Sequence, residues 1–319
     1  MKKTAIWFIA AGVLILAGCI VFVCVMSKLG WSFEKLSSAE YETNTHEIDD
    51  SFKDISITTD TADITFVLSE EDKCRVECYE DKKAKHSVAV ENDALIIKLD
   101  DNREWNDYVG FRFDSPKITV SLPKKEYNAL FVKGSTGSIE VSEAFAFDSA
   151  DLSFSTGNVD FCAAVSGTVK IKTSTGNIGI KNTSVGSLEL SVTTGKVTIT
   201  GVTCGDNAKI NVSTGKAYLT DIRCKNFVSG GSTGNITLSN VVASEKLSVE
   251  RSTGNVKFVG CDAAEIYVKT STGDVGGNLL SDKVFITDTS TGSVDVPSSV
   301  SGGRCEINTS TGDIKIRIG

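Results

Sequence analysis

Two acidic side chains are the candidates for catalysis in this sequence. Glu140 and Asp160 each follow, by three residues, the glycine of a repeated Ser-Thr-Gly motif. If successive repeats stack as neighbouring strands, the two carboxyl groups lie about 5 Å apart, a paired arrangement of the kind that cleaves glycosidic bonds. The same position in the next two repeats holds Gly179 and Thr198, with no basic column beside it. We therefore interpret the pair as solvated, outward-facing acids and predict that the protein is not an enzyme.

The histidines and the first cysteines of the repeat-free region suggest no second site. His46 and His86 are the only histidines, and both lie in polar stretches, which argues against a Ser-His-Asp or Cys-His centre. Cys74 and Cys78 lie roughly 13 Å apart on a predicted strand, too far to bridge each other. No CxxC motif or neighbouring histidine completes a zinc site. We expect no metal and no cofactor.

Two further cysteines fall at equivalent positions of different repeats. Cys204 and Cys224 each lie nine residues after a motif glycine, so they should stack on adjacent turns. In an oxidising compartment such a pair can form a disulfide. As free thiols the two side chains form a buried column of small apolar groups. The pattern favours the thiol interpretation and leaves the disulfide open.

These candidates are positioned by a motif that recurs ten times, nine times as Ser-Thr-Gly and once as Thr-Thr-Gly. Its glycines are 19 or 20 residues apart: Gly137, Gly157, Gly176, Gly195, Gly215, Gly234, Gly254, Gly273, Gly292 and Gly312. A period of this length is typical of a solenoid. Apolar residues lie two and four positions after the glycine, as in Val159 and Phe161, with a polar or small residue between them. This alternation predicts a half-buried β-strand.

One such unit has too little apolar surface to fold alone, so each must stack on its neighbours. Because successive copies run in the same direction, the sheets they form are parallel. The predicted fold class is therefore all-β. It is a parallel β-solenoid, that is, a single-stranded β-helix with right-handed winding, preceded by one N-terminal transmembrane helix.

The motif itself is predicted to be structural. Glycine tolerates the backbone angles that a repeated sharp corner demands. We expect the Ser and Thr hydroxyls to hydrogen-bond backbone groups that the corner leaves unpaired, together with their equivalents one turn away.

The N-terminal segment predicts a membrane anchor. Residues 6–26 carry no charge, and 21 apolar or small residues suffice to cross a bilayer of about 30 Å. Lys2 and Lys3 precede the span and place the N-terminus in the cytoplasm by the positive-inside tendency. We therefore expect a single-pass cell-membrane protein with extracytoplasmic repeats, in which residues 1–28 form the cytoplasmic tip and the anchor.

Two alternatives to an uncleaved anchor remain. Leu16-Ala17-Gly18-Cys19 is similar to a bacterial lipobox, in which Cys19 would be lipidated after cleavage, although an apolar stretch rather than a polar tether follows it. A cleaved signal peptide is the other alternative, for which the apolar run is too long. The anchor and the lipoprotein both leave the repeats tethered on the outer face of the membrane.

The rest of the chain divides into three parts. Residues 29–50 are polar and acidic and predict a linker, residues 51–133 predict irregular N-terminal capping rungs, and residues 134–319 form the regular solenoid. Within the cap, an irregular loop carries Trp105 and Tyr108, which either contact a partner or cover a core edge. At the other end, Lys315 and Arg317 are expected to face outward and protect a free edge, with a partner bound there as the alternative.

An N-terminal span, an irregular β region that closes with Ile118-Thr119-Val120-Ser121-Leu122-Pro123, and serial Ser-Thr-Gly repeats together resemble the bacterial DUF4097 family of adhesin-like proteins. The resemblance covers about residues 45–319. It implies a β-helix displayed on a cell envelope and names no ligand and no site residue. More weakly, it implies an accessory role in envelope stress or regulation.

Charge narrows the partners that we expect. The formal net charge of −8 argues against nucleic acid and against anionic wall polymers. The first hypothesis is a non-enzymatic surface module for binding, adhesion or scaffolding, whose partner is an unidentified protein or glycan of the cell envelope. The alternative is an accessory regulatory protein that acts on a neighbouring membrane sensor.

Overall fold

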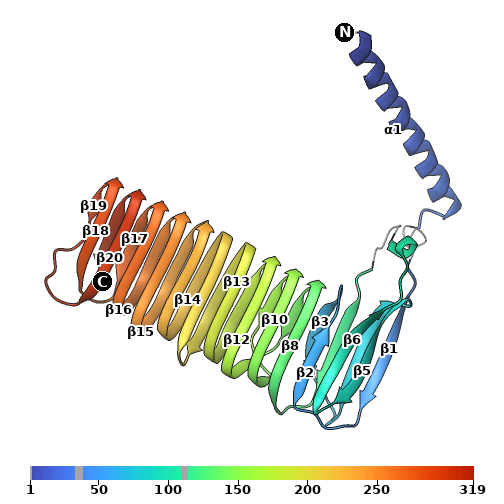
Figure 1. Ribbon diagram of the computed structural model, residues 1–319, viewed down its shortest axis with the longest axis horizontal. Coiled ribbons are helices and arrows are strands. Elements are labelled where there is room, and N and C mark those ends of the chain that lie inside the picture. The colour runs from blue at the N-terminus through green and yellow to red at the C-terminus, as the bar shows by residue number, and fades with distance from the viewer. Residues whose placement is uncertain (1, 33–38, 109–113) are drawn as a thin grey trace.

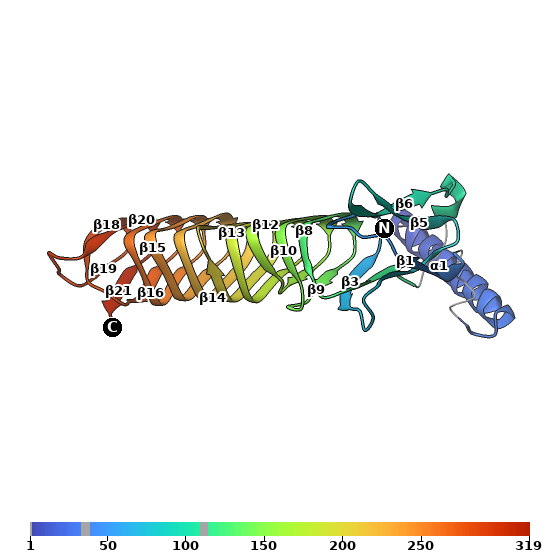
Figure 2. The same ribbon diagram turned by 90° about the horizontal axis from the view of Figure 1, so that it is seen from below.

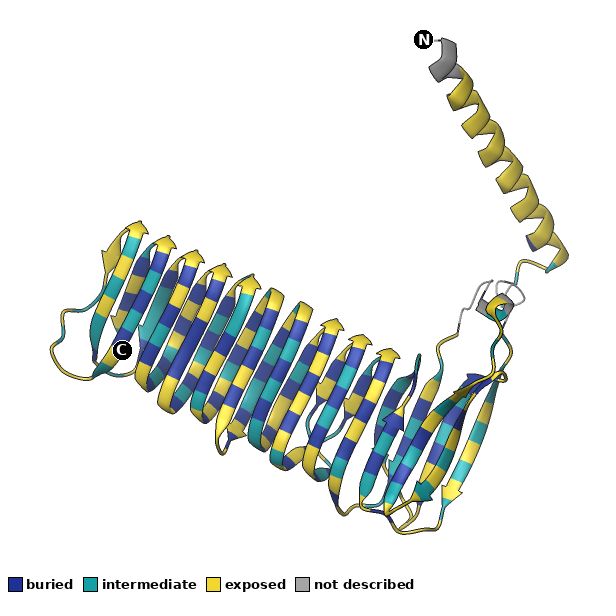
Figure 3. Cartoon of the chain, in the orientation of Figure 1, coloured by how far each residue is buried: buried dark blue, intermediate teal, exposed yellow. Residues whose placement is uncertain are grey.

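The computed structural model describes residues 2–32, 39–108 and 114–319, which form one long helix and a parallel β-solenoid of about ten turns (Figure 1). Helix α1 spans Lys2–Lys28, and from Ile6 to its end its side chains are exposed, except that of Met26 (Figure 3). Within it, Ile6–Lys28 has a mean hydropathy of 3.0 and is long enough to cross a membrane, a property that a signal sequence shares.

The strands of the solenoid stack side by side along one axis (Figure 2). The first turn consists of β2 (Asp54–Thr58) and β3 (Asp63–Leu68). The regular body follows as β8 (Glu126–Thr136), β9 (Ile139–Val141), β10 (Ala146–Thr156), β11 (Val159–Phe161), β12 (Ala164–Thr175), β13 (Ile178–Cys204), β14 (Asn207–Thr233), β15 (Ile236–Thr253) and β16 (Val256–Thr272). The strand pairs of this body are parallel, as the direction of the repeats predicts.

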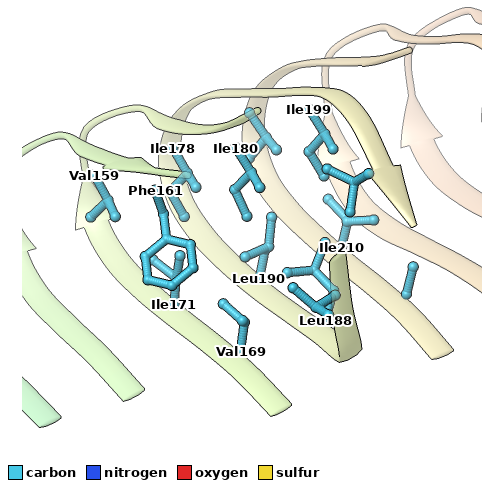
Figure 4. Close-up of a cluster of buried hydrophobic side chains, with 14 of the residues drawn as sticks. Val159, Phe161, Val169, Ile171, Ile178, Ile180, Leu188, Leu190, Ile199 and Ile210 are labelled. Carbon is cyan, nitrogen blue, oxygen red and sulfur yellow. The ribbon is translucent and has the colours of Figure 1, made fainter. Parts of the chain in front are cut away.

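The core is a continuous column of apolar side chains inside the turns. Val159 and Phe161 pair with Ile178 and Ile180 of the next turn, and all four side chains are buried (Figure 4). The residue between each pair faces outward, which produces the alternation of buried and more exposed positions along the strands of the body (Figure 3). Stacking therefore buries apolar surface that a single repeat would leave in water.

The corner glycines adopt a backbone conformation that other residues avoid. All ten have φ between 124° and 156°. At Gly215, where φ is 141°, an added Cβ would lie 1.7 Å from the carbonyl oxygen of Gly195 on the preceding turn. Two requirements therefore act together at each corner, namely the left-handed φ region and the close approach of the neighbouring backbone.

The hydrogen bonds at the corners differ from the prediction. The motif threonines do stack in register, as in Thr156 against Thr175, but their hydroxyls and those of the motif serines are exposed, and none donates a hydrogen bond within the described chain. The side chain of the residue after the glycine bonds the backbone instead. For example, the Asn158 side-chain oxygen accepts a hydrogen bond from the backbone N–H of Asn177 on the next turn at 2.9 Å. Threonines three residues before the glycine also contribute, as where Thr309 donates to the carbonyl of Gly273 at 3.1 Å.

The N-terminal cap is more elaborate than a stack of irregular rungs. Its strands are β1 (Tyr41–Ile48), β4 (Cys74–Asp81), β5 (Ala84–Glu91), β6 (Ala94–Asp101) and β7 (Lys117–Leu122), with a 3-10 turn η2 (Trp105–Tyr108) between β6 and β7. Strands β6 and β7 form a parallel turn outside β2 and β3, whereas β1, β4 and β5 pair antiparallel. Part of the stretch that we expected to be a linker, residues 41–48, is therefore strand β1.

The C-terminal strand is not the end of the stack, so our expectation of a charged free edge at Lys315 and Arg317 was wrong. The last strands are β17 (Val275–Leu279), β18 (Lys283–Thr291), β19 (Val294–Asp295), β20 (Gly303–Thr311) and β21 (Ile314–Ile318). Strand β20 lies between β16 and β18, and β21 lies between β17 and β19. The outermost turn is thus β18–β19, which exposes Ile286 and Val294.

Candidate functional sites

The two acids singled out from the sequence do lie side by side. Asp160 of β11 pairs with Glu140 of β9 on one side and with Gly179 of β13 on the other. Both carboxyl groups are exposed on the outer face of the solenoid, with no hydrogen bond or ion pair to another described side chain. The pair lies in the open on this face, and neither residue lines the cavities described below.

His86, expected in a polar stretch, is instead 4% exposed inside the cap. Its Nδ1 lies 2.7 Å from Glu80 Oε2, and its Nε2 lies 2.9 Å from the Thr59 hydroxyl. Glu80 accepts two further hydrogen bonds, from the His86 backbone N–H at 2.7 Å and from the Asn44 amide at 2.8 Å. Burial raises the pKa of Glu80, but these hydrogen bonds outweigh it and leave the pKa below its usual value.

A carboxylate, an imidazole and a hydroxyl in this order can activate a nucleophile. The adjoining pocket of about 200 Å³ is lined by His86 and by Thr61, but not by Thr59, whose hydroxyl is buried. A substrate in that pocket would therefore not reach the hydroxyl. No sequence motif predicts this network, because Thr59 and Glu80 contact His86 only once the antiparallel strands of the cap have paired.

The same cluster contains the described residues best placed to hold a metal. Ligand atoms of Cys78, Glu80 and His86 lie within 4.8 Å of one another. Burial raises the pKa of the Cys78 thiol to about 12, and both nitrogens of His86 already have hydrogen-bond partners. Metal binding would have to deprotonate this thiol and displace these hydrogen bonds, so the geometry fits a structural network better than a metal centre.

The cysteines of the solenoid and cap are free thiols. Cys204 and Cys224 follow the paired residues Thr203 and Arg223, so they lie on adjacent turns as predicted, and both are buried. They are not joined by a disulfide, which supports the thiol interpretation. Burial raises the pKa of Cys204 to about 11 and that of Cys224 to about 12, which makes both thiols poor nucleophiles at neutral pH.

A groove, here called the axial groove, crosses five successive turns along one edge of the solenoid. Its volume is about 520 Å³. Its buried lining includes Phe147, Val165 and Val185, and its exposed lining includes Glu126, Asp148, Ser166, Ser184 and Thr203. It lies where the pairing of β10 with β12, and of β12 with β13, shifts register. Sequence reasoning missed it because these shifts occur in the variable return between repeats.

The chemistry of the axial groove is that of a binding surface. Its lining contains two carboxylates and no lysine or arginine. One carboxylate, Asp148, accepts a hydrogen bond from the Ser166 hydroxyl at 2.9 Å, which fixes both side chains at the rim. An apolar floor with a polar, acidic rim suits an elongated ligand that carries no net negative charge.

The aromatic residues singled out near the cap behave differently from one another. Trp105, on η2, is 81% exposed. The backbone of Tyr108 belongs to the same turn, but its side chain lies outside the described part of the structure. Tyr127, another aromatic residue of this region, is 1% exposed and packs against Phe52 and Phe147. Of these residues with a described side chain, only Trp105 offers an aromatic surface to a partner.

One family model and several solved structures are similar to this chain. The family model described as Toastrack DUF4097 matches residues 52–215. A solved structure from Parabacteroides distasonis, named a putative lipid binding protein, is similar at 20% identity with a TM-score of 0.49, covering 74% of this chain and 96% of that chain. A putative adhesin from Parabacteroides merdae is similar at 14% identity with a TM-score of 0.47, covering 75% and 96%. No curated protein matches. Because the family model matches more than half of the sequence, the chain belongs to the DUF4097 Toastrack family.

Proposed function

We propose that this chain is a non-enzymatic surface-binding module, held on the outer face of the cell membrane by α1, that captures an elongated ligand along the side of its solenoid. The axial groove carries this proposal. It is continuous over five turns, and its rim side chains are exposed. A ligand that lies along the groove would contact several turns at once, as repeat proteins commonly bind their partners.

The charge of the axial groove supports a ligand class. Glu126 and Asp148 form its charged rim, and the formal net charge of the whole chain is −8. An acidic polymer would be repelled by both. Neutral or cationic chains, either glycans or extended segments of protein, are the ligands that this surface favours, for adhesion to another surface or for scaffolding within the envelope.

The absence of enzymatic activity is part of the proposal. The only predicted pair of catalytic acids is exposed on a flat outer face, and the carboxylate–imidazole–hydroxyl chain of the cap keeps its hydroxyl buried. The helix α1 supports membrane anchoring through its length and hydropathy. Lys2 and Lys3 favour an orientation in which the repeats are extracytoplasmic.

The proposal can be tested with cells that display the full chain and with an array of neutral, cationic and acidic glycans and envelope proteins. We expect the cells to retain neutral or cationic members of the array. Ser184→Trp, which fills the axial groove, should abolish retention, whereas Thr194→Trp, on an exposed corner away from the groove, should not. Retention that survives Ser184→Trp, or that is confined to acidic ligands, would contradict the proposal.

A further inference from the structure

Trp105 is an exposed aromatic residue on a turn whose backbone is held by hydrogen bonds and an ion pair. Its turn η2 is closed by two reciprocal hydrogen bonds, from the Glu104 N–H to Asp107 Oδ2 at 2.9 Å and from the Asp107 N–H to the Glu104 carbonyl at 2.9 Å. Lys83 then forms an ion pair with Asp107 at 2.5 Å. An exposed indole on an ordered turn requires little ordering of the backbone when it binds, which suits an anchoring side chain.

The tip of the β4–β5 hairpin, Lys82 and Lys83, joins the turn with Trp105 to the segment that follows α1. Lys82 donates its backbone N–H to the Glu40 carbonyl at 2.9 Å, and the Asn102 N–H donates to the Lys83 carbonyl at 2.9 Å. The side chain of Lys82 also forms an ion pair with Glu40 at 2.8 Å. The position of Trp105 is therefore fixed relative to residue 40.

Residue 40 cannot lie far from the membrane if α1 spans it. Eleven residues, 29–39, separate the end of α1 from Glu40. Even fully extended, these residues reach at most about 40 Å. The turn with Trp105 is consequently held within reach of the headgroup region that α1 would cross.

The surroundings of Trp105 favour a lipid interface over a protein groove. Its neighbours in sequence with described side chains are Arg103, Glu104 and Asp107. Glu104 is exposed, while Arg103 pairs with Asp101 and Asp107 pairs with Lys83, so the indole projects from among ionic groups. The cores of protein interfaces are depleted of charge and combine several aromatic or apolar side chains. The bilayer headgroup region accepts charged groups and a single amphipathic indole together, which is why tryptophan is enriched there.

We propose that Trp105 inserts its indole ring into the headgroup region of the bilayer that holds α1 and thereby docks the N-terminal cap on the membrane surface. The inference rests on the proposed membrane anchoring and is independent of the axial groove. Docking would set the direction in which the solenoid leaves the membrane.

The test uses the full chain with Trp7→Phe and Trp31→Phe, which leaves Trp105 as its only tryptophan. The protein is reconstituted into phosphatidylethanolamine–phosphatidylglycerol vesicles in which the lipids are brominated either near the glycerol end or near the terminal methyl end of the acyl chain. The matched control adds Trp105→Phe and Tyr218→Trp, which moves the single tryptophan to a side position of the solenoid that is 41% exposed.

We expect the glycerol-end bromines to quench about half of the Trp105 emission and the methyl-end bromines to quench less, as for an interfacial indole. The control tryptophan at position 218 should be quenched by neither. If the protein floats with the vesicles but quenching is negligible at both positions, membrane anchoring by α1 stands and the docking of Trp105 is overturned. If the protein does not float, the anchoring and the docking are both overturned. Capture of a membrane protein by a photoreactive residue at position 105, without lipid quenching, would replace docking by a regulatory contact.

Discussion

The guanidinium of Arg251 occupies the space that Gly231 leaves open on the neighbouring turn. A Cβ at Gly231 would lie 1.8 Å from Arg251 Nη1. The guanidinium is 4% exposed, donates to the Val212 carbonyl at 2.9 Å and to the Ser229 hydroxyl at 3.3 Å, and has no carboxylate partner among the described residues. Burial lowers its pKa. Gly134 accommodates Phe154 in the same way, so at two places in the stack a missing side chain makes room for a large one.

This relationship predicts coupling between the two residues. Gly231→Ala should destabilise the protein, because the new methyl group meets both Arg251 Nη1 and the Val212 carbonyl oxygen. In an Arg251→Ala background one of the two clashes disappears, so the loss should be smaller by about 1 kcal/mol or more. Urea unfolding of the four proteins measures the difference. Gly230→Ala serves as the control and should add to Arg251→Ala, because its Cβ meets only the Asn211 side chain. Equal losses in both backgrounds would contradict the coupling.

The corner geometry predicts a second effect on stability. Gly215→Ala should cost about 3 kcal/mol or more, because φ is 141° and the new Cβ would lie 1.7 Å from the Gly195 carbonyl oxygen. Gly205→Ala is the matched control, since its Cβ would meet nothing closer than 3.7 Å. The comparison is made by denaturant unfolding of the two variants. A Gly215→Ala protein as stable as the control would show that the corner does not require glycine.

The inserted C-terminal turn predicts an unusual order of hydrogen exchange. Strand β20 is paired on both sides, whereas β18 is paired on one side only within the described chain. Amide protons of β20, such as that of Ile307, should therefore exchange more slowly than those of β18, such as that of Phe285. Exchange followed by mass spectrometry or NMR measures this order. A stack that followed chain order would give the reverse result.

The buried network of the cap predicts a dependence of stability on pH. The pKa of Glu80 is below its usual value of 4.5 in the folded protein, so its stabilising contribution is complete above that value and is lost as the pH falls through the folded pKa. Glu80→Gln should be less stable than the natural protein at neutral pH, with a difference that shrinks as the pH falls below the usual carboxyl pKa of 4.5 and through the lower folded pKa. Glu77→Gln, at a half-buried position on the same strand where the carboxylate pairs with Arg75, serves as the comparison. Urea midpoints measured across this range decide the matter, and a constant difference for Glu80→Gln would contradict the assignment.

The cysteines predict a pattern of alkylation. Outside α1, Cys162 is half-buried, while the other six cysteines are buried. Burial raises the pKa of Cys74 and of Cys305 to about 12, so these thiols should react slowly. Brief maleimide treatment of the folded protein, followed by peptide mass spectrometry, should find Cys162 modified first among the seven cysteines outside α1. A disulfide-linked peptide that contains Cys204 and Cys224 would contradict the assignment of free thiols.

Much of the body of the solenoid could be predicted from the sequence because its determinants are local and periodic. The glycine spacing places Asp160 beside Glu140 and Thr156 beside Thr175, and the structure pairs both. The order of the last two turns could not be predicted. The repeat spacing is the same whether β18 or β20 stacks on β16. The spacing of Gly292 and Gly312 therefore does not reveal that β20, although later in the chain, lies between β16 and β18.

The sites depend on contacts that periodicity does not encode. His86 meets Thr59 and Glu80 because the cap folds into antiparallel strands, and short polar stretches such as Tyr41–Ile48 gave no strong strand signal. The axial groove results from register shifts in the returns between repeats, where residues such as Ser166 and Ser184 vary most. The exposure of Trp105 depends on how the loop is held by Lys83, a contact across 24 residues.

The most direct test of the account is photo-crosslinking on intact cells with a photoreactive residue at Ser184 in the axial groove and, in a separate protein, at Thr194 on the corner. The account predicts a covalent adduct with a neutral or cationic glycan or protein segment at position 184 and none at position 194. Equal capture at both positions, or no capture at position 184 by cells that retain ligand, would contradict the assignment of the axial groove as the binding surface.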